Sequence, residues 1–133
     1  MKYFAYGSNM DKKQMKERCP DSKPLYVATL PNYKLIFAGW SRLWQGPVAT
    51  IQRFQGSKVK GALYEISERD LARLDKYEGY PNFYDRIKVI VFDEDGNAVE
   101  AVTYVMKDRE TEGQPSKEYA SVMYRAYKDW GIL

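Results

Sequence analysis

Two short segments of this sequence hold residue types that anion-binding or acid–base chemistry needs. The first is Tyr6-Gly7-Ser8-Asn9, where a run of aromatic and apolar residues breaks at a glycine and is followed by residues that cap helices. A strand that turns into a helix at such a point exposes unpaired backbone N–H groups, which attract anions and developing negative charge. The same residues also suit a purely structural turn.

The second segment is the end of a predicted helix at Glu78, where Gly79 and Pro81 stop the helical pattern. Tyr77 and Tyr80 flank this glutamate, and a carboxylate among aromatic rings loses hydration, which raises its pKa. A raised pKa suits a group that accepts a proton and later returns it near neutral pH. An exposed glutamate before a turn glycine fits the same residues.

The sequence contains no histidine, which limits the types of catalytic and metal-binding site that it can form. Ser–His and Cys–His nucleophile pairs and histidine metal ligands are excluded, so a proton-transfer catalyst must be Asp, Glu, Lys, Tyr or Cys. The one cysteine, Cys19, precedes Pro20 at a predicted helix end, and we interpret it as structural. A single cysteine forms no internal disulfide, in keeping with a reducing compartment.

The length and charge of the chain predict a small globular protein without nucleic acid or membrane partners. Its 133 residues are predicted to form a single domain over 1–133. The 21 basic and 18 acidic residues are dispersed, and the densest basic run, from Lys12 to Arg18, is interpreted as a solvated helix face. The start lacks the apolar run of a signal peptide and no stretch is long enough to cross a membrane, so we expect a cytoplasmic protein.

The elements that must position the two segments are mostly strands. Helices are predicted from Asp11 to Arg18, from the capping box at Ser67, and from Ser116 to the stop at Gly131. This pattern predicts an α+β fold, a small mostly antiparallel β-barrel or curved sheet with a few flanking helices. The strand-like runs are Tyr3–Tyr6, Leu25–Leu30, Lys34–Ala38, Val48–Arg53, Val59–Ile66, Tyr84–Phe92 and Val99–Met106.

Taken together, the motifs closely resemble the γ-glutamylcyclotransferase-like family. The opening FAYGSNM and the later LDKYEG carry most of the resemblance, which covers nearly the whole chain in order. The intervening motifs are GPVATI at 46–51, VKGALY at 59–64 and PSKEY at 115–119.

The resemblance implies a small barrel with a cavity at its mouth and an enzyme that cyclises γ-glutamyl compounds to 5-oxoproline, releasing a free amine. It implies that Glu78 is the catalytic base and acid, and that no cofactor or metal is needed. A γ-glutamyl compound is the expected small-molecule partner, and neither its leaving group nor the oligomeric state follows from the sequence. The residues that the resemblance assigns to substrate binding are Tyr3, Phe4, Ala5, Tyr6, Gly7, Ser8, Asn9 and Tyr119, with Arg42, Trp44 and Tyr84 as candidate pocket lining.

Two other function classes compete with this enzyme. One is a non-catalytic module of the same fold that binds a small molecule, against which the intact Glu78 argues. The other is a small barrel that binds single-stranded nucleic acid through aromatic residues, for which the charges are too dispersed.

Overall fold

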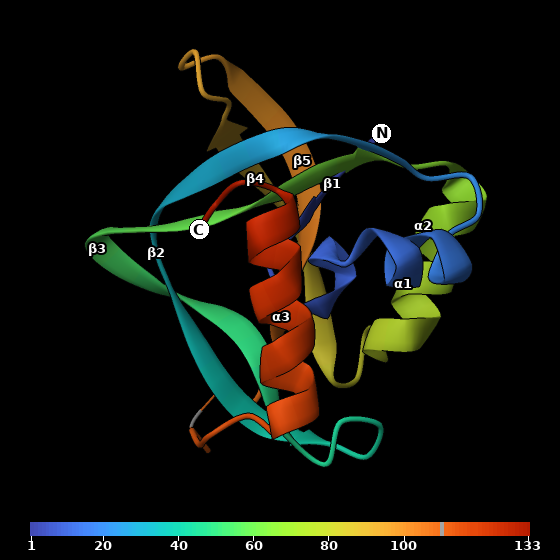
Figure 1. Ribbon diagram of the computed structural model, residues 1–133, viewed down its shortest axis with the longest axis vertical. Helices are drawn as coiled ribbons and strands as arrows, with labels where there is room; N and C mark the ends of the chain where they lie inside the picture. Colours follow the sequence, from blue (N-terminus) through green and yellow to red (C-terminus); the bar gives the residue numbers. More distant parts are fainter. Residues whose placement is uncertain (110) are drawn as a thin grey trace.

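The chain folds into a closed barrel of five β-strands with flanking helices (Figure 1). This computed structural model describes residues 1–109 and 111–133. Neighbouring strands run antiparallel, except that β1 and β5 pair in parallel where Tyr3 lies opposite Val102 and closes the barrel. The predicted α+β barrel is confirmed, in its closed form. In barrel order the strands are β1 (Lys2–Ala5), β3 (Gly46–Glu65), β2 (Lys23–Ser41), β4 (Tyr84–Phe92) and β5 (Ala98–Met106).

The strands β2 and β3 are much longer than the sequence pattern predicts. Each joins two of the predicted runs into one continuous strand, so the prediction of four separate strands in this region is wrong. The apparent break in β2 is a register shift between Pro31 and Tyr33, with Asn32 at a φ of 64°. Opposite it, Gly56 has a φ of 90° and its N–H donates to the Asn32 side chain. Turn-forming residues here bend a long hairpin instead of ending its strands.

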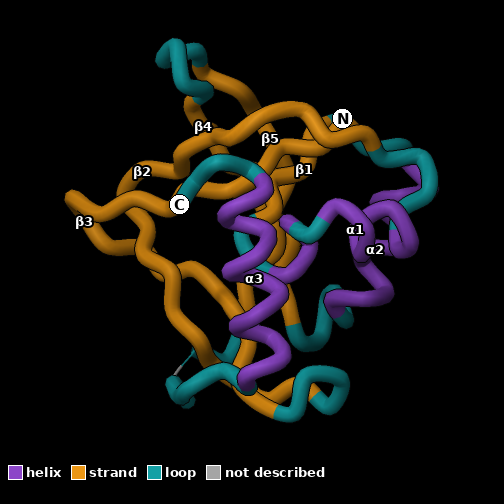
Figure 2. Tube along the Cα trace, in the orientation of Figure 1, coloured by secondary structure: helices purple, strands orange, loops and turns teal. Residues whose placement is uncertain are grey.

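The described residues also form three α-helices and one short 3₁₀ helix. These lie between β1 and β2, between β3 and β4, and after β5. The 3₁₀ helix η1 (Ser8–Met10) follows β1 directly and leads into α1 (Lys12–Arg18). The capping box predicted at Ser67 is present and begins α2 (Glu68–Glu78), while Ser116 caps α3 (Lys117–Asp129). Figure 2 shows α1 and α2 side by side on one flank of the barrel, with α3 lying across its front.

The side chains of β1 alternate between two of the three core clusters that the described residues form. Phe4 and Tyr6 join apolar residues of all five strands, which together fill the barrel interior. Tyr3 and Ala5 point the other way and pack with residues of η1, α1 and α2. The short strand β1 is therefore packed on both faces. This packing fixes the position of the turn that follows it at the rim of the barrel.

Candidate active site

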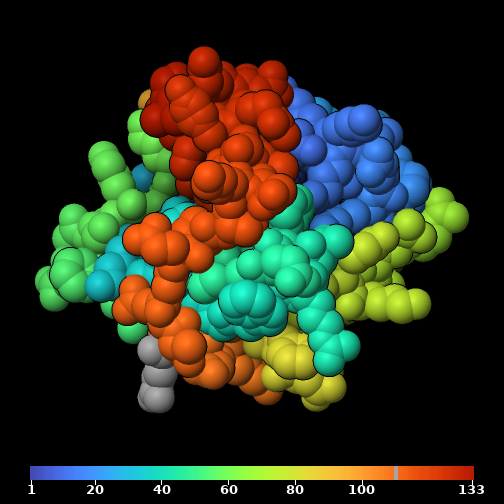
Figure 3. Space-filling view, turned by 60° about the horizontal axis from the view of Figure 1, so that its bottom comes forward, coloured from blue at the N-terminus to red at the C-terminus, as the bar shows by residue number. Residues whose placement is uncertain are grey.

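A pocket of about 1000 Å³ lies where the end of β1, the end of α2 and the start of α3 meet. The tip of the β2–β3 hairpin forms one wall, and the ends of β4 and β5 form another. Figure 3 shows this turquoise hairpin tip lying between the yellow segment after α2 and the orange segment that leads into α3. Both segments singled out from the sequence, around Gly7 and around Glu78, line this pocket.

The turn at Gly7 exposes backbone donors toward the pocket. Gly7 is the residue before η1, and in the described part of the chain no backbone carbonyl accepts from the N–H groups of Gly7, Ser8 or Asn9. Unpaired N–H groups are expected at the first residues of any helix, and here the pocket lies in front of them. The predicted turn with spare donors is therefore present.

The hydroxyl of Tyr119, from the first turn of α3, faces the same turn. Its oxygen accepts a hydrogen bond from the Ala49 backbone N–H at 3.0 Å. Burial raises the pKa of Tyr119, and backbone hydrogen bonds at Ala49 and Ser8 oppose the rise. A hydroxyl that accepts from the backbone keeps its own proton for donation, so Tyr119 presents an O–H donor beside the Gly7 turn.

A hydrogen-bond network anchored on α1 holds the turn in place. The side chain of Gln14 donates to Ser8 Oγ at 2.8 Å and to Asn9 Oδ1 at 3.0 Å, and Arg18 Nη1 donates to Asn9 Oδ1 at 3.1 Å. Asn9 in turn donates to the Tyr3 hydroxyl. Each polar side chain of the turn is therefore fixed by its neighbours, which leaves the backbone donors in a rigid arrangement.

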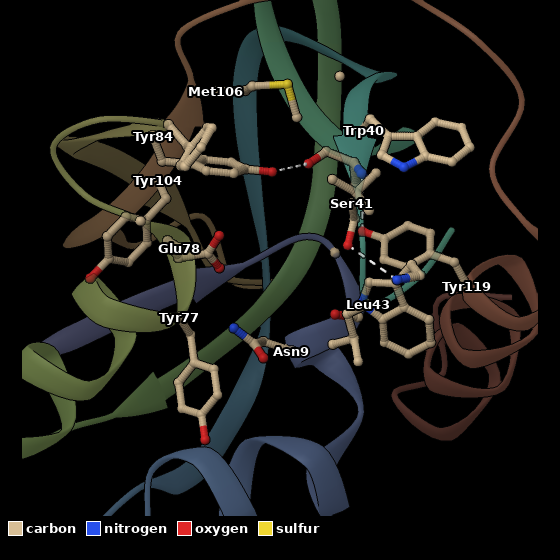
Figure 4. Close-up of a pocket in the computed structure, with 18 of the residues that line it drawn as sticks. Asn9, Trp40, Ser41, Leu43, Tyr77, Glu78, Tyr84, Tyr104, Met106 and Tyr119 are labelled. Carbon is tan, nitrogen blue, oxygen red and sulfur yellow. Dashed lines mark hydrogen bonds between the residues drawn. The ribbon is translucent and has the colours of Figure 1, made fainter. Parts of the chain in front are cut away.

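Glu78 is the last residue of α2, and its carboxylate points into the pocket (Figure 4). Gly79 follows it in the left-handed conformation, with a φ of 67° that favours glycine, and ends the helix there. Burial raises the pKa of Glu78 from 4.5 to about 7, and the positive charge of Arg18 opposes that rise. At neutral pH this carboxyl group exists in both protonation states, which suits proton transfer in either direction.

Five tyrosines that line the pocket lie close enough to this carboxylate to feel its charge. Burial raises the pKa of each, and the negative charge of Glu78 raises it further, so the phenols stay neutral donors. Three of them already donate to protein oxygens: Tyr104 to Asp75 Oδ1 at 2.6 Å, Tyr84 to the Ala49 carbonyl at 3.3 Å, and Tyr6 to the Tyr104 carbonyl. The five are Tyr3, Tyr6, Tyr84, Tyr104 and Tyr119.

Most residues predicted for the site line the pocket, but two do not. Phe4 and Ala5 are 0% and 1% exposed and belong to the two core clusters, because β1 alternates between barrel interior and helix-facing side. The side chains of Phe4 and Ala5 therefore do not line the pocket in which they were predicted to bind substrate. The predicted residues that do line it are Tyr3, Tyr6, Gly7, Ser8, Asn9, Arg42, Trp44, Glu78, Tyr84 and Tyr119.

Sequence reasoning missed several lining residues, and it placed Arg18 wrongly. Lys12, Lys13 and Lys16 are exposed as predicted, but Arg18 is partly buried and lines the pocket. The missed aromatic and apolar residues include Tyr77, Phe83, Tyr104 and Met106. Trp40 and Leu43, which also line the pocket, do carry a signal in the sequence, since large apolar residues are uncommon in turns and both are exposed near the hairpin tip.

Comparison with known proteins now gives the fold and site a context. The family model described as gamma-glutamyl cyclotransferase, AIG2-like, matches residues 3–129. The chain belongs to this family. A gamma-glutamylcyclotransferase from Bos taurus is 33% identical over 98% of the chain and 71% of that protein, and the one from Homo sapiens is 31% identical over the same shares. The resemblance inferred from the motifs is confirmed.

A solved structure titled gamma-glutamyl cyclotransferase matches the fold closely. Its TM-score is 0.94 at 30% identity, covering 99% of this chain and 80% of that one. Family membership supports a cyclotransferase activity and makes this chain a member of an enzyme family. Within the described residues, no group of three or more Cys, Asp or Glu side chains is arranged to hold a metal ion, and no helix is long and apolar enough to cross a membrane.

Proposed function

We propose that this gamma-glutamyl cyclotransferase family member cyclises the γ-glutamyl group of a γ-glutamyl amino acid or amine. The substrate's own α-amine attacks its side-chain amide carbonyl, the bond to the leaving amine breaks, and 5-oxoproline is formed. Because nucleophile and electrophile belong to one molecule, the protein has to fold the substrate, move protons and stabilise charge.

The observation that carries the proposal is Glu78 in its pocket. An α-ammonium has no lone pair for attack, and a carboxylate with a pKa of about 7 is a suitable acceptor for its proton. In becoming a lactam N–H, the nitrogen sheds two protons, and the leaving amine departs as an ammonium that has gained two. Glu78 takes each proton from the attacking nitrogen and returns it to the leaving one.

The Gly7 turn supplies the complementary part of the site. Attack on the amide carbonyl creates an oxyanion, and preorganised donors aimed at that charge lower the barrier. The unpaired N–H groups at Gly7 and Asn9, with the O–H of Tyr119, are the donors we assign to this oxyanion. Glu78 lies across the pocket from Tyr119, which leaves room for the folded substrate between proton acceptor and oxyanion donors (Figure 4).

Release of 5-oxoproline, detected by mass spectrometry, tests the proposal. The purified protein is incubated with γ-glutamyl-alanine, γ-glutamyl ethylamide and ε-(γ-glutamyl)-lysine, alongside the Glu78→Gln variant. A matched control is Glu68→Gln, which removes the same charge from the exposed first residue of the same helix. We expect activity in the wild type and in Glu68→Gln, and a loss in Glu78→Gln of at least about 100-fold.

Two outcomes would contradict the proposal. Undiminished activity in Glu78→Gln would remove this residue from the reaction. Saturable binding of the γ-glutamyl compounds without any product over long incubation would indicate a binding module in place of an enzyme.

A further inference from the structure

Among the cationic residues that line the pocket, one is partly buried and has no role in the proposed reaction. Arg18, the last residue of α1, lines the pocket and is partly buried. The other cationic residues that line the pocket, Arg42, Lys76 and Lys107, are exposed to solvent. A buried guanidinium is costly unless it is paired, so its partner is informative.

The guanidinium of Arg18 is held in a fixed orientation by neutral groups. Its Nη1 donates to Asn9 Oδ1 at 3.1 Å, and its central carbon lies 4.7 Å from the centre of the Tyr77 ring. Hydrogen bonding on one edge and ring stacking on one face both restrict how the planar group can turn. The Arg18 carbonyl also accepts a hydrogen bond from the Arg73 side chain, which ties the end of α1 to α2.

Within the described residues, no carboxylate forms an ion pair with Arg18. Glu78 also lines the pocket and feels the positive charge of Arg18, yet the two do not form a salt bridge. Arginine carries several N–H donors in a planar fork, and the bond to Asn9 uses one of them. The remaining donors are available to an anion that enters the pocket.

We propose that Arg18 binds the α-carboxylate of the γ-glutamyl group, an inference that rests on the proposed function. In a γ-glutamyl compound, this carboxylate and the attacking amine share one carbon atom. An amine placed at Glu78 therefore carries its carboxylate within a few ångströms, into the part of the pocket where the Arg18 fork is free. Planar, two-pronged recognition of a carboxylate is what arginine does better than lysine.

This contact would determine one part of the substrate specificity. Substrates must carry a free α-carboxylate, whatever amine leaves. The positive charge of Arg18 also offsets the repulsion between the Glu78 carboxylate and the substrate carboxylate, so both can occupy one pocket.

Three substrates that differ only in their carboxylates test the inference. γ-Glutamyl-alanine carries an α-carboxylate and a leaving-group carboxylate, 4-aminobutyryl-alanine lacks the first, and γ-glutamyl ethylamide lacks the second. Products are 5-oxoproline from the γ-glutamyl compounds and 2-pyrrolidinone from the 4-aminobutyryl compound. Each is measured with wild type, Arg18→Ala, Arg18→Lys and the control Lys13→Gln, which removes a charge from an exposed position on the same helix.

We expect Arg18→Ala to lower kcat/KM by roughly 10- to 100-fold for both γ-glutamyl substrates. We expect 4-aminobutyryl-alanine to be a poor substrate, since the group that Arg18 contacts is missing. For this compound the change caused by Arg18→Ala should stay below about threefold on the high-pH plateau, where Glu78 is ionised in both proteins. Arg18→Lys should recover part of the loss, because it keeps the charge without the fork. Lys13→Gln should match the wild type.

Three results would overturn the inference. An equal loss on the γ-glutamyl and 4-aminobutyryl substrates would make Arg18 a structural support of Asn9. A loss confined to the alanine compounds would assign Arg18 to the leaving-group carboxylate. A wild type that processes 4-aminobutyryl-alanine as well as γ-glutamyl-alanine would show that no α-carboxylate site exists. A wild type inactive on all three would instead contradict the proposed function itself.

Discussion

Gly7 lies so close to Tyr119 that a Cβ atom at position 7 would stand 3.0 Å from the phenolic oxygen of that tyrosine. The same Cβ would lie 3.4 Å from the Cβ of Ala49. Gly7 has a φ of −111°, which any residue adopts, so the need for glycine at this position comes from space and not from backbone conformation. This contact joins the turn after β1 to α3, which is more than a hundred residues later in the chain.

We therefore expect Gly7→Ala to lower kcat/KM by roughly 10- to 100-fold, because it displaces the Tyr119 hydroxyl or the turn that faces it. Steady-state kinetics of 5-oxoproline release measures this. The double variant Gly7→Ala/Tyr119→Phe is the control, since removing the hydroxyl removes the closest contact of the new methyl group. Strictly additive effects in this double-mutant cycle would argue against the contact as the cause.

The activity should depend on the ionisation of Glu78. Because the carboxylate form of Glu78 is the proposed proton acceptor, kcat/KM should fall about tenfold per pH unit below a pKa near 7 and reach a plateau above it. A pH–rate profile from about pH 4 to about pH 9 with γ-glutamyl-alanine measures this limb. Removing the opposing charge with Arg18→Ala should shift the limb upward, and a limb that stays near pH 4.5 would contradict the burial of Glu78.

The stability of the fold should show the same titration without any substrate. Since the folded pKa of Glu78 lies above its ordinary value, the folded state holds the proton more tightly than the unfolded state. The free energy of unfolding should therefore decrease as the pH rises from about 4.5 to about 7, by on the order of 3 kcal/mol.

Glu78→Gln carries no such titration and should be more stable than the wild type at pH 8, while the two should be alike at pH 4.5. Urea unfolding at both pH values measures the difference, with Glu68→Gln as the exposed comparison on the same helix. A Glu78→Gln variant less stable than the wild type at pH 8 would show that the carboxylate stabilises the fold.

Arg42, exposed at the hairpin tip, should affect substrate binding more than folding. We expect Arg42→Ala to change KM by several-fold while the free energy of unfolding stays within about 0.5 kcal/mol of wild type. Arg125→Ala, an exposed arginine of α3 that is not among the lining residues, is the matched control. Unchanged KM values across the substrate panel would remove Arg42 from the site.

The sequence predicted those parts of the site that depend on local chemistry. The capping box at Ser67 and the glycine after Glu78 mark both ends of α2, so the glutamate could be placed at a helix end. The break at Gly7 likewise predicted the turn and its donors. Such features are determined within a few residues and need no knowledge of the rest of the chain.

Contacts between segments that are far apart in the chain could not be predicted from local sequence patterns. In the sequence, Pro31 and Asn32 have the residue types of a strand end. The structure shows a bulge instead, in which the Gly56 N–H donates to the Asn32 side chain. Arg18 follows three lysines in one basic run, and only the packing of α1 against α2 turns it toward the pocket while they face solvent. Tyr104 belongs to a predicted strand, and its place beside Glu78 depends on how the barrel closes.

The closure of the barrel through β1 and β5 also governs when this protein becomes competent during its synthesis. Tyr3 pairs with Val102, and the Gly7 turn meets Tyr119, more than a hundred residues later. A nascent chain emerges from the ribosome from its N-terminus, so it has both Gly7 and Glu78 long before it has the walls that hold them. A chain that stops before α3 therefore carries Glu78 without Tyr119 and without the wall of the pocket that α3 provides.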